Sequence, residues 1–585
     1  MTLSKTTFQD SEFRLFRISV LSGLVGVVAG LTAYLLLELI ALLSNIFFFG
    51  KFSSELPSFT ENPWGAWLPL LPALGGLVIG LMARFAPQIQ GHGIPEAMEA
   101  VLFRRSRISP KVAVMKPLST AIAIGTGGPF GAEGPIIQTG GALGSLLGQL
   151  LDTTASERKV LLACGAAAGM AATFSTPISA VILAVELLLF EFRSRSFIPL
   201  VVSATLATNV HFVLLGRGAL FEVGALEFGL PDQLPYYALL GILAGVSAVL
   251  LTKALYGIED LFERLPGDPI WRPFLGGLLF GCMALLVPRI LGVGYGTITD
   301  ILNDRLSLNL LFAIMVFKTL GMLVTLGSGT SGGLLAPTFM SSAAMGSLYA
   351  HLVNTWHPQA QLDPGAYALA ALAAVFGAAS RSTFAFVVFA FEITRNYDAV
   401  LPIMVVAVVA DAIGVLFLPN SIQTEKLARR GQNVHHEYEA DPLLQMRVEE
   451  AMVKNFIACP ADEKLDCLLE RHTFFEQQII PLLDIQGELV GTLTREDALR
   501  AKAQSDHPLT ALQAGSGNPT TVQAGDPVQN AVNKMLGCRL AYLIVVDPQR
   551  PKTMVGLIGR EHILMAYEKR HQEETAREPG WLTRT

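Results

Sequence analysis

The stretch Gly125-Thr-Gly-Gly-Pro-Phe-Gly131-Ala-Glu133-Gly-Pro135 interrupts apolar sequence with glycine and proline. Farther along the chain, Gly327-Ser-Gly-Thr-Ser-Gly-Gly333-Leu-Leu-Ala-Pro337 follows the same pattern, G-x-G-x-x-x-G-x-x-x-P. A broken helix in a bilayer is tolerated only where its loose backbone is buried in protein or lines a wet cavity. Two such breaks in corresponding halves of a chain predict a binding site near the membrane midplane. Because the free N–H groups and the dipole of a helix N-terminus favour an anion, the sequence predicts a pathway for negative ions.

The bulk composition is typical of a membrane protein. The chain has 585 residues, of which 51% are hydrophobic and 15% charged, and its mean hydropathy is +0.48. A soluble chain carries about 25% charged residues. The net charge of −6 is modest and argues against nucleic-acid binding. The five cysteines form no C-x-x-C pair, so we expect neither a disulfide framework nor a metal site.

Apolar runs cover most of residues 18–418. Several are long enough, alone or with their neighbours, for the roughly 20 residues of a spanning helix: Ile18–Leu43, Trp67–Met82, Tyr237–Leu251, Phe274–Val287 and Val400–Leu418. The first run is too long for a cleavable signal peptide. Basic residues precede the first run and follow the last one (Lys5, Arg14 and Arg17; Lys426, Arg429 and Arg430). The positive-inside rule therefore places both termini in the cytoplasm, and the number of spans stays open.

The composition changes near residue 425, after which charges are dense and apolar segments short. The later part contains Val490-Gly-Thr-Leu-Thr-Arg-Glu-Asp-Ala-Leu499 and Val555-Gly-Leu-Ile-Gly-Arg-Glu-His-Ile-Leu564, which share V-G-x-x-x-R-E-x-x-L. Each follows a strand-like run and a turn and opens a helix-like stretch, which predicts a β–turn–β–α unit used twice. We expect these strands at Ile479–Leu483 and Ala541–Val546, and short entry strands at Met452–Ile457 and Pro519–Val522.

The sequence thus predicts a mainly α-helical membrane protein followed by an α/β module. The expected segments are an N-terminal segment 1–17, a membrane domain 18–425 with repeat halves of roughly 18–215 and 235–425, a linker 426–446, two α/β repeats at 447–505 and 506–570, and a tail 571–585. A second correspondence supports the repeat inside the membrane domain, because Gly169–Pro177–Glu186 parallels Gly377–Thr383–Glu392.

At these residues the chain resembles the CLC family of chloride channels and chloride/proton exchangers. Gly91-His92-Gly93-Ile94-Pro95 resembles the family's G-S-G-I-P, Gly131-Ala-Glu133-Gly-Pro135 its G-[KR]-E-G-P, and Gly333-Leu-Leu-Ala-Pro337 its G-x-F-x-P. The later part resembles a tandem of cystathionine-β-synthase (CBS) domains. The resemblance implies two inverted halves with broken helices, one pore per subunit, and a homodimer in the lipid bilayer, here expected in the bacterial inner membrane. Chloride is the default substrate, and a similar small anion stays open.

Glu133 is the candidate gate. A carboxylate inside an apolar segment is costly and usually faces a pathway, and an ionised Glu133 can occupy an anion site that a protonated one leaves. The alternative is a buried acid paired with a basic residue such as Lys116. The resemblance implies that anions are coordinated by backbone amides, externally those of Ala132, Glu133, Gly134, Leu335 and Ala336, and centrally those of Leu334 and Leu335, with Gly93 and Ile94 beside them.

Three positions depart from the family pattern. His92 replaces a serine that touches the central ion; its imidazole either binds the anion or is satisfied in a helix interface. Gln423 stands where the family commonly has a tyrosine. Leu187 stands where the proton-coupled members carry an internal glutamate, and leucine cannot carry a proton. The alternative is that a shifted alignment makes Glu186 or Glu191 the substitute, on a different side of the helix. This missing acid favours a channel or weakly coupled transporter, with a chloride/proton antiporter of the same fold as the alternative.

Thr494 and Asp497 form the T-x-x-D pair with which CBS domains often hold an adenosine ribose, and the alternative is a helix N-cap. No cofactor is required, and an adenine nucleotide is the candidate ligand of this module. We expect no enzyme, because the apolar part contains no H-E-x-x-H and no obvious set of a nucleophile with its base. A more distant alternative is a CBS-containing divalent-cation transporter, which would use intramembrane carboxylates such as Glu186 and Glu392.

Overall fold

The structure is a computed structural model that describes residues 13–60, 62–432, 443, 446–470, 477–505 and 507–582. The chain divides into two compact units, Met1–Gln432 together with Ala576–Thr585, and Asn433–Thr575. We call them the membrane unit and the C-terminal unit. Most of the predicted N-terminal segment (1–12) and of the predicted linker (433–442, 444 and 445) lies outside the described residues, as do residues 583–585.

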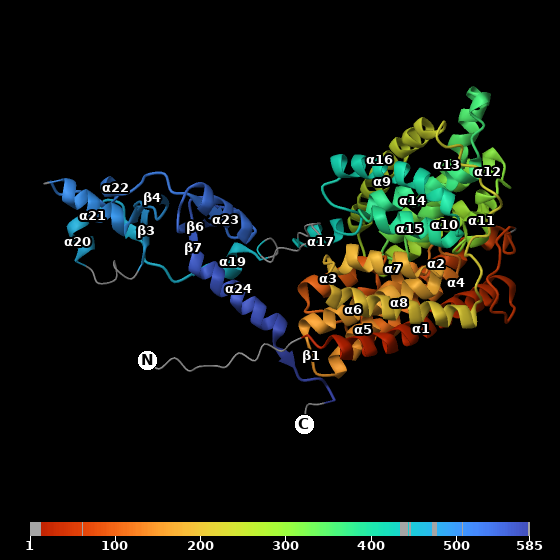
Figure 1. Ribbon diagram of the computed structural model, residues 1–585, viewed down its shortest axis with the longest axis horizontal. Helices are drawn as coiled ribbons and strands as arrows, with labels where there is room; N and C mark the ends of the chain where they lie inside the picture. Colours follow the sequence, from red (N-terminus) through yellow and green to blue (C-terminus); the bar gives the residue numbers. More distant parts are fainter. Residues whose placement is uncertain are drawn as a thin grey trace. The chain divides into compact units, whose positions relative to one another are not determined.

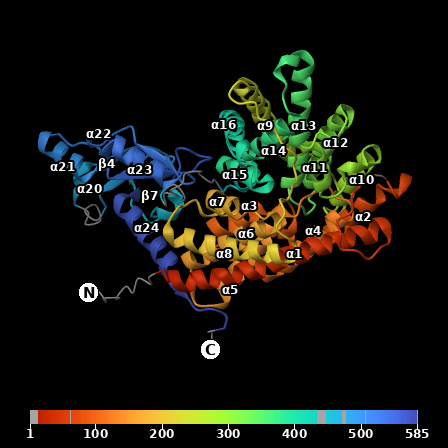
Figure 2. The ribbon, with the colours of Figure 1, turned by 45° about the vertical axis from the view of Figure 1, so that its right-hand side comes forward.

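The membrane unit consists of two helical halves with the same order of elements (Figure 1). The first half contains α1 (Leu15–Phe49), α2 (Leu70–Phe85), α3 (Ile94–Phe103), α4 (Pro110–Gly125), α5 (Glu133–Leu150), α6 (Ala155–Phe174), α7 (Pro177–Ala184) and α8 (Ser194–Leu214). The second contains α9 (Leu234–Glu263), α10 (Trp271–Leu286), α11 (Tyr295–Leu302), α12 (Leu308–Gly327), α13 (Leu335–Trp356), α14 (Pro364–Ser380), α15 (Thr383–Thr394) and α16 (Val400–Phe417). The short α17 (Glu425–Arg429) follows. Within this unit, Figures 1 and 2 show α1–α8 on one side and α9–α16 on the other.

The same helix pairs pack in both halves. Helix α5 lies along α6 as α13 lies along α14, and α1 packs on α8 as α9 packs on α16. Small residues allow the close approach: a Cβ atom added at Gly140 of α5 would overlap the carbonyl of Gly165 on α6, and one at Gly346 would overlap the carbonyl of Tyr367. Such small-residue contacts are typical of helix packing in membranes.

Among the described residues, six helical segments are long and apolar enough to cross a membrane: Leu15–Phe49, Gly65–Phe85, Ser194–Leu214, Leu234–Glu263, Leu308–Gly327 and Tyr397–Phe417. Four of them contain most or all of a run expected from the sequence. The fifth expected run forms α10, which is a shorter apolar helix. The segments around α8 and α12 were missed, and α12 contains the buried Lys318.

Two buried lysines occupy equivalent places in the two halves. Lys116 Nζ on α4 donates to the carbonyls of Ile89 and Gly91, both at 2.7 Å. Lys318 Nζ on α12 donates to the carbonyls of Ile290 and Gly292, at 2.8 and 2.7 Å. Lys116 thus holds the turn before α3 in place, and Lys318 the turn before α11. Hydrogen bonds to a charged donor contribute about 1.5–3 kcal/mol each, which offsets part of the cost of burying the charge.

The C-terminal unit contains two three-stranded sheets with the same topology. The first joins β2 (Cys459–Pro460), β3 (Ile479–Leu483) and β4 (Leu489–Thr494), and the second joins β5 (Thr521–Gln523), β6 (Tyr542–Val546) and β7 (Met554–Gly559). In each sheet the first pair is parallel and the second antiparallel. An equivalent register shift occurs near the end of β3 and of β6. The predicted repeat is therefore present as two α/β units of equal design.

The shared V-G-x-x-x-R-E motif runs from a strand into a helix in both units. It spans β4 and α21 (Arg495–Gln504) in the first, and β7 and α24 (Arg560–Thr575) in the second. Other helices are α19 (Val448–Ala451), α20 (Leu465–Leu469), α22 (Ala511–Ala514) and α23 (Val528–Gly537). The expected entry strand Met452–Ile457 was wrong. That segment has no strand beyond a single bridge at Val453, and the entry strand is β2, because Cys459 rather than an earlier residue pairs with β3.

Candidate anion-binding site

The two glycine-rich breaks meet each other. Gly131 N donates to Gly333 O at 3.1 Å, and Gly333 N donates to Gly131 O at 2.8 Å. Beside this pair, Gly91 N donates to Thr330 O at 2.8 Å. The loop before α3 and the loops before α5 and α13 are therefore held at one place, inside the membrane unit, as the repeated pattern predicted.

Three helices begin at this junction without a side-chain cap. The N-cap positions are Gly93 for α3, Ala132 for α5 and Leu334 for α13. The first N–H groups of a helix have no partner within it. Those of α5 and α13, at Glu133, Gly134, Leu335 and Ala336, belong to buried residues. The pairing of Gly131 with Gly333 thus holds the buried starts of α5 and α13 next to each other, and helix starts favour negative charge.

Glu133 lies at this point and is fully buried. Its Oε1 accepts a hydrogen bond of 3.1 Å from the Tyr295 hydroxyl, while Oε2 has no hydrogen-bond partner among the described residues. The carboxylate also interacts with the backbone N–H of Ala336. A Cβ atom added at Gly131 would overlap it, and one at Gly333 would lie 2.9 Å from Oε2. The carboxylate therefore occupies the space between the two breaks, where the helix ends favour an anion.

The alternative, a pairing of Glu133 with a basic residue such as Lys116, does not occur with Lys116, because Lys116 Nζ donates to the carbonyls of Ile89 and Gly91. The charge of Lys318 acts on Glu133, while Lys318 Nζ donates to the carbonyls of Ile290 and Gly292. Tyr295, at the start of α11, was not predicted. A signal for it exists: Gly292-Val-Gly294-Tyr295 in the second half repeats Gly91-His-Gly93-Ile94 in the first. Aligning the halves at these glycines places Tyr295 at a helix start equivalent to that of Ile94.

His92 and Gln423 carry unpaired polar atoms at buried positions. His92 is 4% exposed and Gln423 fully buried. In the described part of the chain, neither ring nitrogen of His92 and neither amide atom of Gln423 has a hydrogen-bond partner. Buried polar groups in proteins are nearly always hydrogen-bonded, so unpaired ones call for a partner of another kind. The alternative that His92 is satisfied in a helix interface therefore has no support in these contacts.

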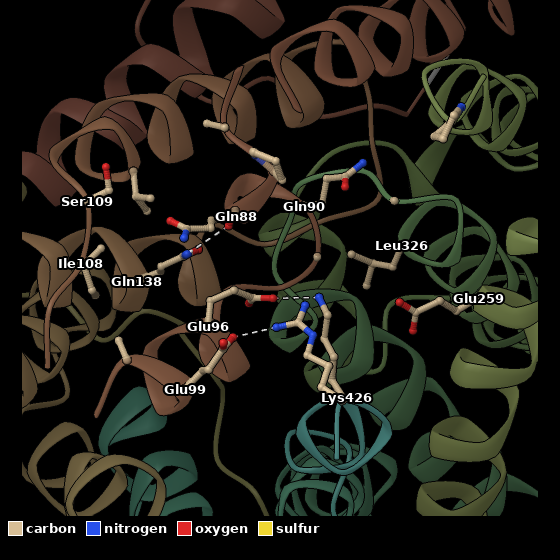
Figure 3. Close-up of a pocket in the computed structure, with 18 of the residues that line it drawn as sticks. Gln88, Gln90, Glu96, Glu99, Ile108, Ser109, Gln138, Glu259, Leu326 and Lys426 are labelled. Atoms are coloured by element: carbon tan, nitrogen blue, oxygen red, sulfur yellow. Dashed lines mark hydrogen bonds and ion pairs between the residues drawn. The ribbon is translucent and has the colours of Figure 1, made fainter. Parts of the chain in front are cut away.

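A cavity of about 660 Å³ reaches this region from one side. Figure 3 shows part of its lining, including Gln88, Gln90, Glu96, Gln138 and Lys426. The Lys426 ammonium on α17 lies 2.7 Å from a carboxylate oxygen of Glu96 on α3. Gly91, the neighbour of His92, also lines the cavity. The cavity thus provides a polar approach to the loop that carries His92.

Leu187 lies in apolar surroundings. It is buried in the π-helical turn Val185–Leu189 that follows α7. It shares a small void with apolar side chains, among them Ile94, Ile137 and Met170. This position therefore offers no group that could bind a proton.

Glu186 and Glu392 serve as reciprocal helix caps. Glu392 on α15 accepts hydrogen bonds from the backbone of Ile178 and Ser179 at the start of α7, at 3.0 and 2.8 Å. Glu186, just after α7, accepts one of 3.3 Å from the backbone of Ala385 at the start of α15. Carboxylates at helix N-termini are stabilising. Both acids are thus engaged with backbone donors, and no cluster of metal-ligating side chains occurs among the residues that the structure describes.

Thr494 caps α21 in the C-terminal unit. Its hydroxyl oxygen accepts from Asp497 N at 3.1 Å and its hydroxyl donates to Asp497 Oδ2 at 2.6 Å. The N-cap alternative is therefore realised, and it leaves Asp497 Oδ1 free of this bond. At the equivalent place of the second repeat, Gly559 N donates to His562 Nδ1 at 3.1 Å.

Comparison with known proteins agrees with this geometry. Residues 74–415, more than half of the chain, match the family model described as voltage gated chloride channel. The chain belongs to the CLC family. The H(+)/Cl(-) exchange transporter ClcA of Vibrio cholerae is 30% identical over 425 residues, which cover 72% of this chain and 90% of the relative. A putative chloride channel protein, ClcB-like, of Ralstonia nicotianae is 29% identical over 351 residues, covering 59% and 82%.

Solved CLC structures extend the likeness. A slow cyanobacterial Cl⁻/H⁺ antiporter matches with a TM-score of 0.61 and 25% identity, covering 71% of this chain and 96% of that one. A eukaryotic CLC transporter matches with a TM-score of 0.62 over 94% of this chain and 98% of that one, at 19% identity. The latter shows a shared fold that includes the C-terminal unit. The helical CLC fold expected from the sequence is confirmed, and so is the expectation of CLC-type anion transport.

Proposed function

We propose that this CLC protein is a chloride/proton antiporter in which Glu133 exchanges places with the anion. The observation that carries the proposal is the Glu133 carboxylate itself, held between Gly131 and Gly333 at the uncapped starts of α5 and α13. An ionised carboxylate there is a tethered anion. When it takes a proton it loses its attraction for the N–H groups, and chloride replaces it. One residue thereby links proton movement to anion movement.

This proposal departs from the expectation of a channel or weakly coupled transporter. That expectation rested on Leu187, a leucine in place of the internal glutamate of the proton-coupled members. The replacement affects that one position and leaves the Glu133 carboxyl group in place. The relatives and solved structures named for exchange include ClcA of Vibrio cholerae and the cyanobacterial antiporter, and they support coupled transport over a passive channel. The cation-transporter alternative loses support, because Glu186 and Glu392 cap helices instead of facing a shared site.

We place His92, Gln423 and the amides of Ile94, Ala132, Gly134, Leu334, Leu335 and Ala336 around the transported anion. The unpaired N–H donors of His92 and Gln423 support this placement, since chloride would accept hydrogen bonds from them. The protein acts as a homodimer in the bacterial inner membrane with both termini in the cytoplasm. Exposed apolar side chains on α15 and α16, including Phe384, Leu401, Val408 and Leu416, support an apolar environment for this face.

The C-terminal unit is proposed to be a tandem CBS module that binds an adenine nucleotide near Thr494 and Asp497. The duplicated sheet order and the strand-to-helix motif support the module. The nucleotide proposal rests on Asp497 Oδ1, which takes no part in the Thr494 cap and lies 3.9 Å from Arg500 Nη1. This oxygen could bind a ribose hydroxyl in place of that ion pair while Thr494 keeps its cap.

The deciding experiment uses the full chain in proteoliposomes loaded with chloride. An outward chloride gradient is imposed at equal pH on both sides, and external pH is recorded. An antiporter moves protons into the vesicles against the growing proton gradient, and valinomycin with potassium keeps the membrane potential fixed. Chloride efflux without proton uptake would overturn antiport and leave a channel. Replacement of chloride by gluconate is the control for a leak.

A further inference from the structure

The last described residues of the chain return to the membrane unit. Strand β8 (Arg577–Glu578) pairs antiparallel with β1 (Thr153–Thr154), the short strand that joins α5 to α6. We call residues 576–582 the C-terminal strap. No pattern in the sequence indicated it, because a two-residue strand has too few positions to show periodicity.

The strap continues along the end of α5 with further backbone bonds. Gly580 N donates to Asp152 Oδ1 at 2.8 Å. Trp581 N donates to the carbonyl of Gln149 at 3.0 Å, and Leu582 N to that of Leu150 at 3.3 Å. The last carbonyls of a helix lack partners within it, so the strap supplies donors that α5 itself cannot. A side chain at Gly580 would overlap the carbonyl of Leu150, so this position requires glycine.

Glu578 anchors the strap in a group of arginines. Its carboxylate lies 3.0 Å from Arg158 Nη2, bonds to Arg107, and lies 3.7 Å from Arg105. The Arg158 side chain is 2% exposed, and its Nε also donates to the carbonyl of Arg105. Burial raises the pKa of Glu578, but the hydrogen bond from Arg107 and the charge of Arg158 outweigh it and lower that pKa below its usual value. The carboxylate is therefore held ionised. We call Arg105, Arg107 and Arg158 the arginine cluster.

The arginine cluster borders the cavity that leads to the candidate anion site. Arg107 is one of the residues that line this cavity. Lys426 and Arg430 line it too, but their charges are paired with those of Glu96 and Glu99. An anion entering the cavity is attracted by such charges, and the attraction acts over about 8 Å at physiological ionic strength. With the strap in place, Glu578 offsets this charge. With the strap released, Arg107 and Arg158 lose the carboxylate that the structure gives them.

The strap is also the direct continuation of the C-terminal unit. Helix α24 ends at Thr575, and the strap begins at Ala576. The C-terminal unit is therefore joined to the membrane unit at two points of the chain, after Gln432 and before Ala576. A change of shape in the C-terminal unit would act on the strap through α24.

We propose that the C-terminal strap is a releasable docking segment that binds the α5–α6 turn and masks the arginine cluster. Release of the strap raises the rate at which anions enter the cavity. This inference rests on the proposed anion transport for its consequence, whereas docking itself is independent of transport.

Docking is tested directly with a peptide. The chain ending at Thr575 is purified in detergent and titrated with a fluorescein-labelled peptide of residues 576–585, with anisotropy as the readout. Saturable binding is expected. A Glu578→Lys peptide is expected to bind at least about tenfold more weakly, because it meets the arginine cluster with like charge. An Arg577→Ala peptide is the matched control, because Arg577 is exposed and adjacent on the same strand. Equal binding of all three peptides, or none by the native one, overturns the docking site.

A second measurement avoids truncation. Hydrogen–deuterium exchange compares the full-length chain with its Glu578→Lys and Arg577→Ala variants. Glu578→Lys is expected to speed exchange of the amides at 577–582 and in the α5–α6 turn. Arg577→Ala is expected to leave them unchanged. Unchanged protection in Glu578→Lys overturns Glu578 as the anchor even where the shortened chain fails to fold.

The consequence for transport is tested with Glu578→Gln in proteoliposomes, with chloride supplied on the side of the chain termini. The initial chloride flux is expected to rise about threefold at low ionic strength and to approach the native rate when gluconate salt screens the charge. Arg577→Ala is expected to match the native chain at both ionic strengths. If the native chain transports chloride and Glu578→Gln gives the same flux, the proposal that the strap masks the arginine cluster is overturned. Absence of native flux refutes the proposed transport, and the peptide titration still decides docking.

Discussion

Gly131 and Gly333 hydrogen-bond to each other through both their N–H and C=O groups, although one belongs to each half of the membrane unit. The bridge between them is antiparallel. Because the Glu133 carboxylate lies directly against this pair, the geometry of the glycines decides where the acid sits.

Glu133→Gln is expected to abolish proton coupling while chloride flux persists. The amide keeps the size of the side chain but neither ionises nor takes up a proton. Chloride flux measured from pH 4.5 to 7.5 should become independent of pH, and uphill proton uptake should fall to the level of empty vesicles. A variant that keeps its pH response would remove Glu133 from the exchange.

Gly131→Ala is expected to displace the Glu133 carboxylate without altering the acid. The added Cβ overlaps only the flexible end of that side chain among its three nearest atoms, so the carboxylate must move while the backbone stays. Flux should lose much of its dependence on pH, as in Glu133→Ala. The double variant Gly131→Ala/Glu133→Ala should behave as Glu133→Ala alone. A further loss of activity in the double variant would instead indicate general damage to the site.

His92→Ser is expected to change the ratio of chloride to nitrate flux or its dependence on pH. The buried imidazole has two unpaired nitrogens near the proposed anion, and serine offers one smaller hydroxyl in their place. The matched control is Val293→Ser, at the equivalent position before α11. Flux ratios for both anions are measured in the same vesicles. Identical ratios and pH profiles in His92→Ser and the native chain would assign His92 a packing role.

Thr494→Ala is expected to remove the helix cap of α21, and Asp497→Asn to weaken nucleotide binding while it keeps that cap. Loss of the cap should destabilise the C-terminal unit by about 1 kcal/mol, whether or not a nucleotide binds. Asp497→Asn leaves the Thr494 cap on α21 intact but weakens an acceptor for ribose hydroxyls. Calorimetric titration of the full chain with ATP, ADP and AMP is the readout. Heat in the native chain that is lost in Asp497→Asn supports binding at this pair, whereas no heat in either leaves only the cap.

Docking of the C-terminal strap is expected to weaken in acid. The pKa of Glu578 is lowered below its usual value of 4.5 in the docked state. The carboxylate therefore contributes fully above pH 4.5, and its contribution is lost as pH falls through the lower, docked value. Peptide anisotropy should report weaker binding below pH 4.5. A Glu578→Gln peptide should bind weakly at every pH with no such transition.

The sequence predicted those parts of the site that follow from the need to shield interrupted backbone from lipid. The backbone of the two glycine- and proline-containing breaks must be buried away from lipid. The repeated pattern alone therefore predicted that the breaks meet, as Gly131 and Gly333 do. Helix α12 was missed because Lys318 interrupts its apolar run, and that charge is satisfied by carbonyls of Ile290 and Gly292, which precede it in the chain. The channel expectation gave Leu187 more weight than one position allows. Glu578 could not be placed, because its partners are arginines far away in sequence.

Glu186 and Glu392 each cap a helix of the other half, so each half depends on the other to fold. Glu392 closes the start of α7, and Glu186 closes the start of α15. Neither half holds the acid that its own helix needs, so a half-length chain expressed alone would leave that helix end unsatisfied. Such a fragment would have to recruit a second copy, and we expect the two halves, produced as separate polypeptides, to assemble with each other.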